Sequence, residues 1–275
     1  MSEEVDPARR RLQEMIAAGG DYLDLGLASI LIGAEEEEGV DVDHALRALD
    51  DLAESAQVAL EGSTELQRVA CLIEHLFVHV GFRGNKEDYG DPKNSYLHQV
   101  LERKIGLPIT LCILLIEVAR RVGIELHGVG FPTHFLVGLT GQPGLYIDAF
   151  NGGRILTVDE CKALLHVNTG GVLAFDRSYL HPTPTSGVLA RVSRNLKTIY
   201  LRREAYDEAL RAAQRIVMLS PGDWVEVRER GVIQFRRGAF GAAITDLSVY
   251  LSEVPEASDR AEVEALIDQS RELLE

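Results

Sequence analysis

Apolar residues recur at helical spacing in three stretches within residues 1–82, with polar residues between them. The apolar positions are Leu23, Leu25, Leu27, Ile30 and Leu31 in the first stretch, Leu46, Leu49, Leu52 and Ala56 in the second, and Leu66, Val69, Leu72, Leu76 and Val80 in the third. The pattern predicts a helical N-terminal segment over residues 1–62 and a strong helix over residues 64–82.

The pattern changes in the middle of the chain. Residues 82–96 are rich in Gly, Asn, Asp and Pro, which is typical of turns or an ordered loop. A short helix is expected over residues 95–104, and a longer one from Pro108, because proline is favoured in the first turn. Residues 124–156 hold short β-rich runs separated by Gly and Pro, which predicts about three antiparallel strands and an α+β core. The segment HPTPTSG, residues 181–187, is typical of a linker.

An internal repeat follows this linker. The interval from Pro221 to Pro255 is the same as the interval from Ala209 to Ala243. A period of this length, about 34 residues, with alanine in the second helix and a closing proline, resembles the tetratricopeptide repeat and implies two helix-turn-helix units. Residues 259–274 can supply the helix that caps the second unit.

Acidic residues are concentrated at the N-terminus. The 275-residue chain has 28 Lys and Arg against 43 Asp and Glu, a formal net charge of −15, and residues 1–62 carry −12 of it. This balance excludes binding of nucleic acid or a membrane surface through a broad basic face. We expect the run Glu35–Glu38 to be a solvated helix end; the alternative is a docking tail for a basic partner. The expected domains are an acidic helical segment packed on the core (1–62), the core (63–186) and the repeats (187–275).

The N-terminal residues and the number of cysteines predict the cellular compartment. The N-terminus, MSEEVDPARRR, has acids where a secretory signal needs a basic start and an apolar run. Cys71, Cys112 and Cys161 are too few and too scattered for a disulfide framework or a four-thiolate zinc site. We therefore expect a cytoplasmic protein without a metal or organic cofactor.

His134 and Asp148 are the first candidates for chemistry. His134 lies in a probable strand, HFLVGL, and Asp148 lies at the exit of the next run, LYIDAF. A hairpin would bring both side chains to one end of the sheet, where a carboxylate can fix the imidazole tautomer. Because Cys112 lies on the preceding helix, a Cys112–His134–Asp148 nucleophilic triad is one hypothesis. The other is a structural histidine with a turn-capping aspartate.

The order of these parts resembles a known family. A helix followed by ARRVGIELHGVGF, then His134 and, one hairpin later, Asp148, is similar to the transglutaminase-like core of the papain-like structural class. Joined to FRGNKEDYGDPKNSYLHQVLERKIGLPITL upstream and to the repeats downstream, it resembles the bacterial SirB family. The resemblance runs from about residue 22 to the C-terminus, and residues 82–153 carry most of its specificity.

The resemblance implies a degenerate site. In active members of the superfamily the helix begins Gly-x-Cys and later reads Arg-x-x-Gly-Ile. Alignment on Arg120 and on Gly123-Ile124 puts Pro108 at the nucleophile position and Cys112 at a small-residue position one turn deeper. Proline offers no nucleophile.

Two other side chains near this helix start are weaker candidates for a nucleophile. Cys112 lies in the apolar stretch Leu111–Ile116, where burial raises the pKa of a thiol and leaves it inert. Thr110 lies nearer the helix start but has nothing to activate it. We expect a vestigial cleft formed by Pro108, Thr110, His134, Asp148 and Asn94.

Arginines mark the predicted repeats. Arg191, Arg194 and Arg202 lie on the first repeat helix and Arg228 on the third, with acids interleaved. They form solvated faces on one interpretation. On the other they capture an acidic peptide or a C-terminal carboxylate.

The sequence thus favours a non-catalytic interaction, scaffold or regulatory protein, with an inactivated transglutaminase-like domain and peptide-binding repeats. The alternative is a thiol-dependent amidase, peptidase or acyl-transferase that uses Cys112, His134 and Asp148. The expected partner is a protein or peptide, not nucleic acid or a membrane, and the oligomeric state stays open.

Overall fold

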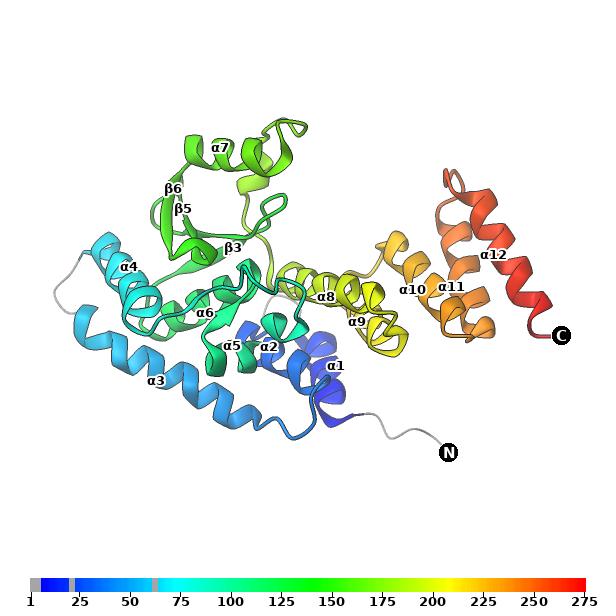
Figure 1. Ribbon diagram of the computed structural model, residues 1–275, viewed down its shortest axis with the longest axis horizontal. Coiled ribbons are helices and arrows are strands. Elements are labelled where there is room, and N and C mark those ends of the chain that lie inside the picture. Colours follow the sequence, from blue (N-terminus) through cyan, green and yellow to red (C-terminus); the bar gives the residue numbers. More distant parts are fainter. Residues whose placement is uncertain (1–5, 20–22, 61–63) are drawn as a thin grey trace. The chain divides into compact units, whose positions relative to one another are not determined.

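The computed structural model describes residues 6–19, 23–60 and 64–275. The chain divides into two compact units, Met1–Val188 and Leu189–Glu275 (Figure 1). The domain boundary expected between residues 62 and 63 lies outside the described residues, as do residues 1–5 and 20–22 of the N-terminal segment.

Four helices occupy the described part of residues 6–73, in line with the apolar pattern. They are α1 (Pro7–Gly19), α2 (Leu25–Ala34), α3 (Val42–Leu60) and α4 (Glu65–Ile73). Eight of the ten residues of α2 are buried, because α1, α3, α5 and α6 all pack against it. No helix in the described residues is long and apolar enough to cross a membrane.

The helix predicted over residues 64–82 changes form after Ile73. Residues Glu74–His79 form a π-helical segment, which continues α4 and ends where the amide of Val80 donates to the carbonyl of His75 at 2.8 Å. Apolar spacing alone does not reveal this, because a π turn inserts one residue without breaking the apolar stretch.

The acidic run after α2 is not simply a solvated helix end. Glu35 is 9% exposed, and a carboxylate oxygen lies 3.3 Å from Nη1 of Arg9. Oε2 of Glu37 lies 2.8 Å from Nε2 of His98. The solvated-end prediction is wrong for these two glutamates, because α1 and a later helix supply partners that are distant in sequence.

A short parallel pair of strands joins the loop after α4 to the central helix. β1 (Arg83–Gly84) pairs with β2 (Ile105–Gly106), and a 3-10 turn (Pro92–Ser95) and α5 (Leu97–Arg103) lie between them in sequence. Helix α6 (Pro108–Arg121) begins at the predicted proline, and twelve of its fourteen residues are buried.

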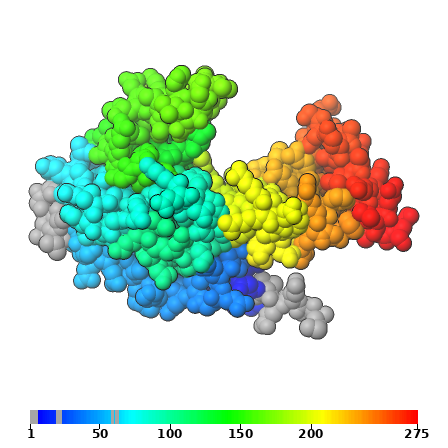
Figure 2. Space-filling model, viewed as in Figure 1, coloured from blue at the N-terminus to red at the C-terminus, as the bar shows by residue number. Residues whose placement is uncertain are grey.

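The core sheet has four strands where about three were expected. They are β3 (Leu126–Val129), β4 (Leu136–Leu139), β5 (Leu145–Asp148) and β6 (Arg154–Thr157), in the order β3-β4-β5-β6 and all antiparallel. Helix α6 packs on β3 and β4, and α7 (Val158–Thr169) packs by β6 through Cys161 and Leu165 (Figure 1). On the face shown in Figure 2, the blue and cyan helices and the green segment around α7 form the surface of this unit.

The repeat helices are α8 (Thr185–Arg202), α9 (Tyr206–Leu219), α10 (Trp224–Arg236), α11 (Phe240–Glu253) and α12 (Arg260–Glu272). The starts of α9 and α11 are separated by the predicted repeat period, and so are their ends, which confirms the period. Ala209 and Ala243, at equivalent positions, are fully buried, because a small side chain lets neighbouring helices approach closely. Residues from Thr185 onward of the predicted linker form the first turn of α8.

Candidate functional site

His134 and Asp148 meet at one end of the four-stranded sheet. Asp148 is the last residue of β5, and His134 precedes β4, which pairs with β5. Nε2 of His134 lies 2.8 Å from Oδ1 of Asp148, and the two side chains are only 8% and 4% exposed. The strand assignment of His134 is wrong: it lies in the turn that leads into β4.

A strained turn positions His134. Its amide donates to the carbonyl of Phe131 at 3.1 Å, across a turn with Pro132 and Thr133 at its centre. Thr133 has a φ of +60°, a left-handed conformation that β-branched residues rarely adopt. Such strain persists where the surrounding structure imposes it, and it is concentrated at functional sites.

Asn151 completes the surroundings of Asp148. Its amide donates to Oδ1 of Asp148 at 3.2 Å, and its side-chain Nδ2 donates to Oδ2 at 2.8 Å. Burial alone would raise the pKa of the Asp148 carboxyl, but the hydrogen bonds from His134 and Asn151 and the attraction of His134 outweigh burial and lower the pKa. Asp148 is therefore a carboxylate at neutral pH, and its Oδ1 is hydrogen-bonded to Nε2 of His134.

The first turn of α6 is closed by structural hydrogen bonds. Pro108 is buried at the first helical position. Oγ1 of Thr110 donates to the carbonyl of Asn94 at 2.6 Å and accepts from the amide of Leu107 at 3.0 Å. Thr110 is fully buried, so its hydroxyl caps the helix and ties down the preceding loop.

The Asn94 side chain holds together the loop that precedes α5. Its Nδ2 donates to the carbonyl of Asp88 at 2.7 Å, and its Oδ1 accepts from Nδ2 of Asn85 at 3.0 Å. Asn94 is fully buried, and its polar side-chain atoms are engaged in these bonds.

The cysteines of the core are enclosed. Cys112 is fully buried on α6, and its Sγ lies 3.5 Å from the carbonyl oxygen of Phe135, to which it donates. Cys161 on α7 is also fully buried, and burial raises the pKa of its thiol to about 12. A protonated thiol is a poor nucleophile, so Cys161 is inert at neutral pH.

Phe150 shields one side of His134, a role that the sequence did not indicate. Its ring packs edge-on to His134 with the centroids 6.2 Å apart, and Tyr89 packs on the same ring at 6.1 Å. A Cβ atom at Gly84 would lie 2.4 Å from Cδ2 of Phe150, so a glycine at this position lets the ring approach the backbone of β1. Beside Asp148 and Asn151, a cavity of about 250 Å³ reaches α7.

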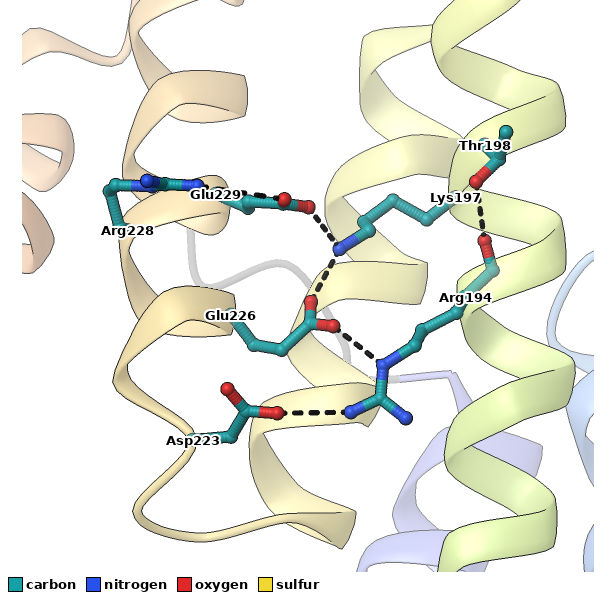
Figure 3. Close-up of polar contacts among 7 residues, drawn as sticks. All are labelled: Arg194, Lys197, Thr198, Asp223, Glu226, Arg228 and Glu229. Carbon is teal, nitrogen blue, oxygen red and sulfur yellow. Dashed lines mark hydrogen bonds and ion pairs between the residues drawn. The ribbon is translucent and has the colours of Figure 1, made fainter. Parts of the chain in front are cut away.

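The repeat arginines are engaged by acids of neighbouring helices (Figure 3). Arg194 on α8 bonds Asp223 at 3.0 Å and Glu226 at 2.6 Å, and Lys197 on the same helix bonds Glu226 and Glu229. Burial raises the pKa of the Glu226 carboxyl, but the hydrogen bonds and charges of Lys197 and Arg194 outweigh burial and lower the pKa.

The other predicted arginines differ in their surroundings. Arg228 on α10 pairs with Asp259 and lies over the ring of Tyr250 at 5.6 Å. Arg202 is exposed at the end of α8, and Arg191 is half-buried.

Comparison with known proteins identifies the family. Residues 43–194, more than half of the chain, match the transglutaminase-like superfamily. The chain belongs to this superfamily. Residues 196–268 match the tetratricopeptide repeat, so the α+β core followed by helical repeats is confirmed.

Relatives of this transglutaminase-like protein include bacterial and animal proteins. A UPF0162 protein of Xylella fastidiosa is 39% identical over 213 residues, which cover 76% of each chain. A UPF0162 protein of Vibrio cholerae is 30% identical over 207 residues, 74% of this chain and 76% of the relative. F-box only protein 21 of Mus musculus is 42% identical over 99 residues, 33% of this chain and 16% of its own. No solved structure matches the chain.

The core and the repeats of this transglutaminase-like protein thus hold different kinds of side-chain arrangement. The core holds a buried His134–Asp148 pair and, at the start of α6, a proline. Residues 196–268 carry tetratricopeptide repeats, which generally mediate protein–protein interactions. Among the described residues, no group of three or more His, Cys, Asp or Glu side chains is arranged to hold a metal ion.

Sequence reasoning missed Asn151, Phe150 and Thr133. Asn151 could have been found, because an Asp three residues before a polar residue in a Gly-rich turn is typical of a capping interaction. Phe150 and Thr133 act through tertiary packing and backbone conformation, for which the local sequence has no signal.

Proposed function

We propose that this protein is a non-catalytic, cytoplasmic scaffold or regulatory protein of the SirB type that binds a protein or peptide partner through its repeats. The observation that supports this is the start of α6, where Pro108 occupies the first helical position. In the family resemblance, this is the position of the nucleophilic cysteine.

The physical argument concerns activation of a thiol. Unpaired amides and the positive end of the helix dipole lower the pKa of a thiol only within the first turn. Cys112 lies one turn further along α6, fully buried, and Thr110 is bonded as a cap. His134 and Asp148 then serve as remnants that hold the ends of β4 and β5 together.

A matched pair of proteins tests this proposal. In a Cys71→Ser background, iodoacetamide labelling with mass spectrometry is expected to leave Cys112 of the wild type unmodified. Pro108→Cys is expected to label faster than Cys112, because its thiol lies in the first turn of α6, where helix N-terminal amides lower the pKa of a thiol. A wild-type Cys112 that labels fast, with a pH dependence lost in His134→Ala, would contradict the proposal.

The intact His134–Asp148 hydrogen bond, with the lowered pKa of Asp148, favours a second candidate. This is a thiol-dependent amidase, peptidase or acyl-transferase that uses Cys112, His134 and Asp148. It requires α6 to open enough to expose the Cys112 thiol. Turnover of acyl or amide substrates that disappears in Cys112→Ala would establish it.

A further inference from the structure

The repeat unit contains a cavity of about 580 Å³ with walls from α8, α10 and α12. Its apolar lining includes Leu201, Val232 and Leu266, each half-buried. A cavity of this size fits one or two apolar side chains of a bound segment rather than a whole helix.

One of the two guanidinium groups on the cavity wall, Arg228, is already paired with carboxylates, whereas Arg236 is exposed and lies within ion-pair distance of none of the described acids. Arg194, Lys197 and Arg228 each contact one or two carboxylates of the same unit (Figure 3). To pair with any of these three groups, an acidic ligand would have to displace these charge-assisted hydrogen bonds, which are among the stronger protein contacts. Arg236 is therefore the wall cation that a carboxylate could reach without displacing such a bond.

Acids exceed bases on the cavity wall. It carries four carboxylates, from Glu204, Glu229, Asp259 and Glu262, against two guanidinium groups, from Arg228 and Arg236. Glu204 and Glu262 are exposed, and no basic group among the described residues lies within ion-pair distance of either. Their charges are available to a cation from outside.

Glu204 lies just after the end of α8. Its φ is +56°, a left-handed conformation that costs a non-glycine residue free energy. The equivalent position one repeat later is Gly238, with a φ of +80°. Both residues occupy the left-handed position that follows the end of a helix, where the amides of Ala205 and Ala239 donate back to the carbonyls of Tyr200 and Gln234. The first repeat has a glutamate there and the second a glycine, so the carboxylate at this position of the cavity is a feature of the first repeat alone.

We propose that this cavity binds a cationic segment of a partner protein, in which a Lys or Arg lies next to an apolar side chain. The apolar side chain enters between Leu201, Val232 and Leu266, and the cation lies between Glu204 and Glu262. This inference rests on the proposed interaction function and specifies the chemistry of the partner.

Fluorescence anisotropy with three labelled peptides tests the inference on the full-length protein. The peptides alternate Leu with Lys, with Gln or with Glu, and are matched in length and blocked at both ends. We expect the Leu-Lys peptide to bind about tenfold more tightly than the Leu-Gln peptide and the Leu-Glu peptide to bind least. The preference should weaken from 0.1 M to 1 M salt, as the screening length falls from about 10 Å to about 3 Å.

Variants locate the binding. Glu204→Gly and Glu262→Gln should each weaken binding of the Leu-Lys peptide several-fold, whereas Glu253→Gln, an exposed acid on α11 outside the cavity, should not. Glu204→Gly relieves the left-handed strain, so its melting temperature should equal or exceed that of the wild type, and weaker binding cannot be attributed to unfolding.

Three results would overturn the inference: no binding of any peptide, equal or tighter binding of the Leu-Glu peptide, or variants without effect. Tight binding of the Leu-Glu peptide at the cavity would leave the proposed interaction function intact. The thiol-labelling experiment tests the non-catalytic part separately, since it does not depend on the repeats.

Discussion

Arg194 and Arg228 lie one repeat period apart, and each pairs with the aspartate at the N-cap position of a later helix of the repeat array. Arg194 contacts Asp223, the N-cap residue of α10, and Arg228 contacts Asp259, the N-cap residue of α12. A carboxylate at a helix N-terminus is favoured by the helix dipole, so one aspartate serves both its own helix and the neighbouring repeat. This repeated contact is the nearest-neighbour coupling by which helical repeats gain stability.

Lys197→Met should destabilise the repeat unit by about 2–4 kcal/mol. The Lys197 side chain is 6% exposed between two carboxylates, and its loss leaves the nearly buried Glu226 with fewer cations. The sequence has one tryptophan, Trp224 on α10, so urea unfolding followed by its fluorescence reports on this unit. The double variant Lys197→Met/Glu226→Gln should lose less stability than Lys197→Met alone. An equal or larger loss would argue that the unpaired Glu226 carboxylate is not the cause.

Asp148→Asn should reduce the sensitivity of the core to acid. The native pKa of Asp148 is lowered, whereas the carboxyl has a pKa of about 3.9 in an unfolded chain. As pH falls, the unfolded chain therefore binds this proton first. The stability that Asp148 contributes is complete above about pH 5 and is lost as pH falls through the native pKa.

The measurement for Asp148 is circular dichroism melting from pH 7 to pH 3. The asparagine variant should be less stable than wild type at pH 7, and the difference should shrink toward pH 3. A difference that is constant over this range would show that ionisation of Asp148 does not contribute.

Thr133→Gly should stabilise the core by about 1 kcal/mol, because glycine adopts a positive φ without steric cost. Lys104→Gly is a matched comparison, since Lys104 has a φ of +59° at the end of α5, away from the His134 turn. Thermal melting should show the larger gain for Thr133→Gly, because a β-branched side chain is more strained there. A loss of stability in Thr133→Gly alone would mean that the threonine side chain makes contacts worth more than its strain.

Gly84→Ala should destabilise the core by about 1–3 kcal/mol through overpacking. The added Cβ would lie 2.4 Å from Cδ2 of Phe150, so the ring must move from its position beside His134. In the double variant Gly84→Ala/Phe150→Leu the cost of the added methyl should fall, and thermal melts of the four proteins form a double-mutant cycle. Additive costs would show that the methyl and the ring do not interact.

Local patterns by themselves determined the order of elements. Proline at position 108 starts α6, and the repeat period reproduces α9 and α11, because first-turn preference and repeat periodicity depend on the local sequence alone. The sheet was predicted in kind but with one strand too few, and the π-helical segment after α4 was not predicted.

The candidate site likewise has features that the sequence predicted and features that it did not. The proximity of His134 and Asp148 was predicted from the sequence, because a hairpin between the two runs would bring both residues to one end of the sheet, and the structure shows them hydrogen-bonded there. The surroundings of the pair were not predicted. They are the Phe150 ring packed edge-on to His134, the left-handed turn at Thr133, and the bond from Thr110 to the carbonyl of Asn94 in a distant loop. In the repeats the arginines were visible as residue types, but the acids that pair with Arg194 and Arg228 belong to later parts of the array. Only the tertiary structure decided whether these charges face solvent or one another, because that depends on which distant groups are brought within hydrogen-bond distance.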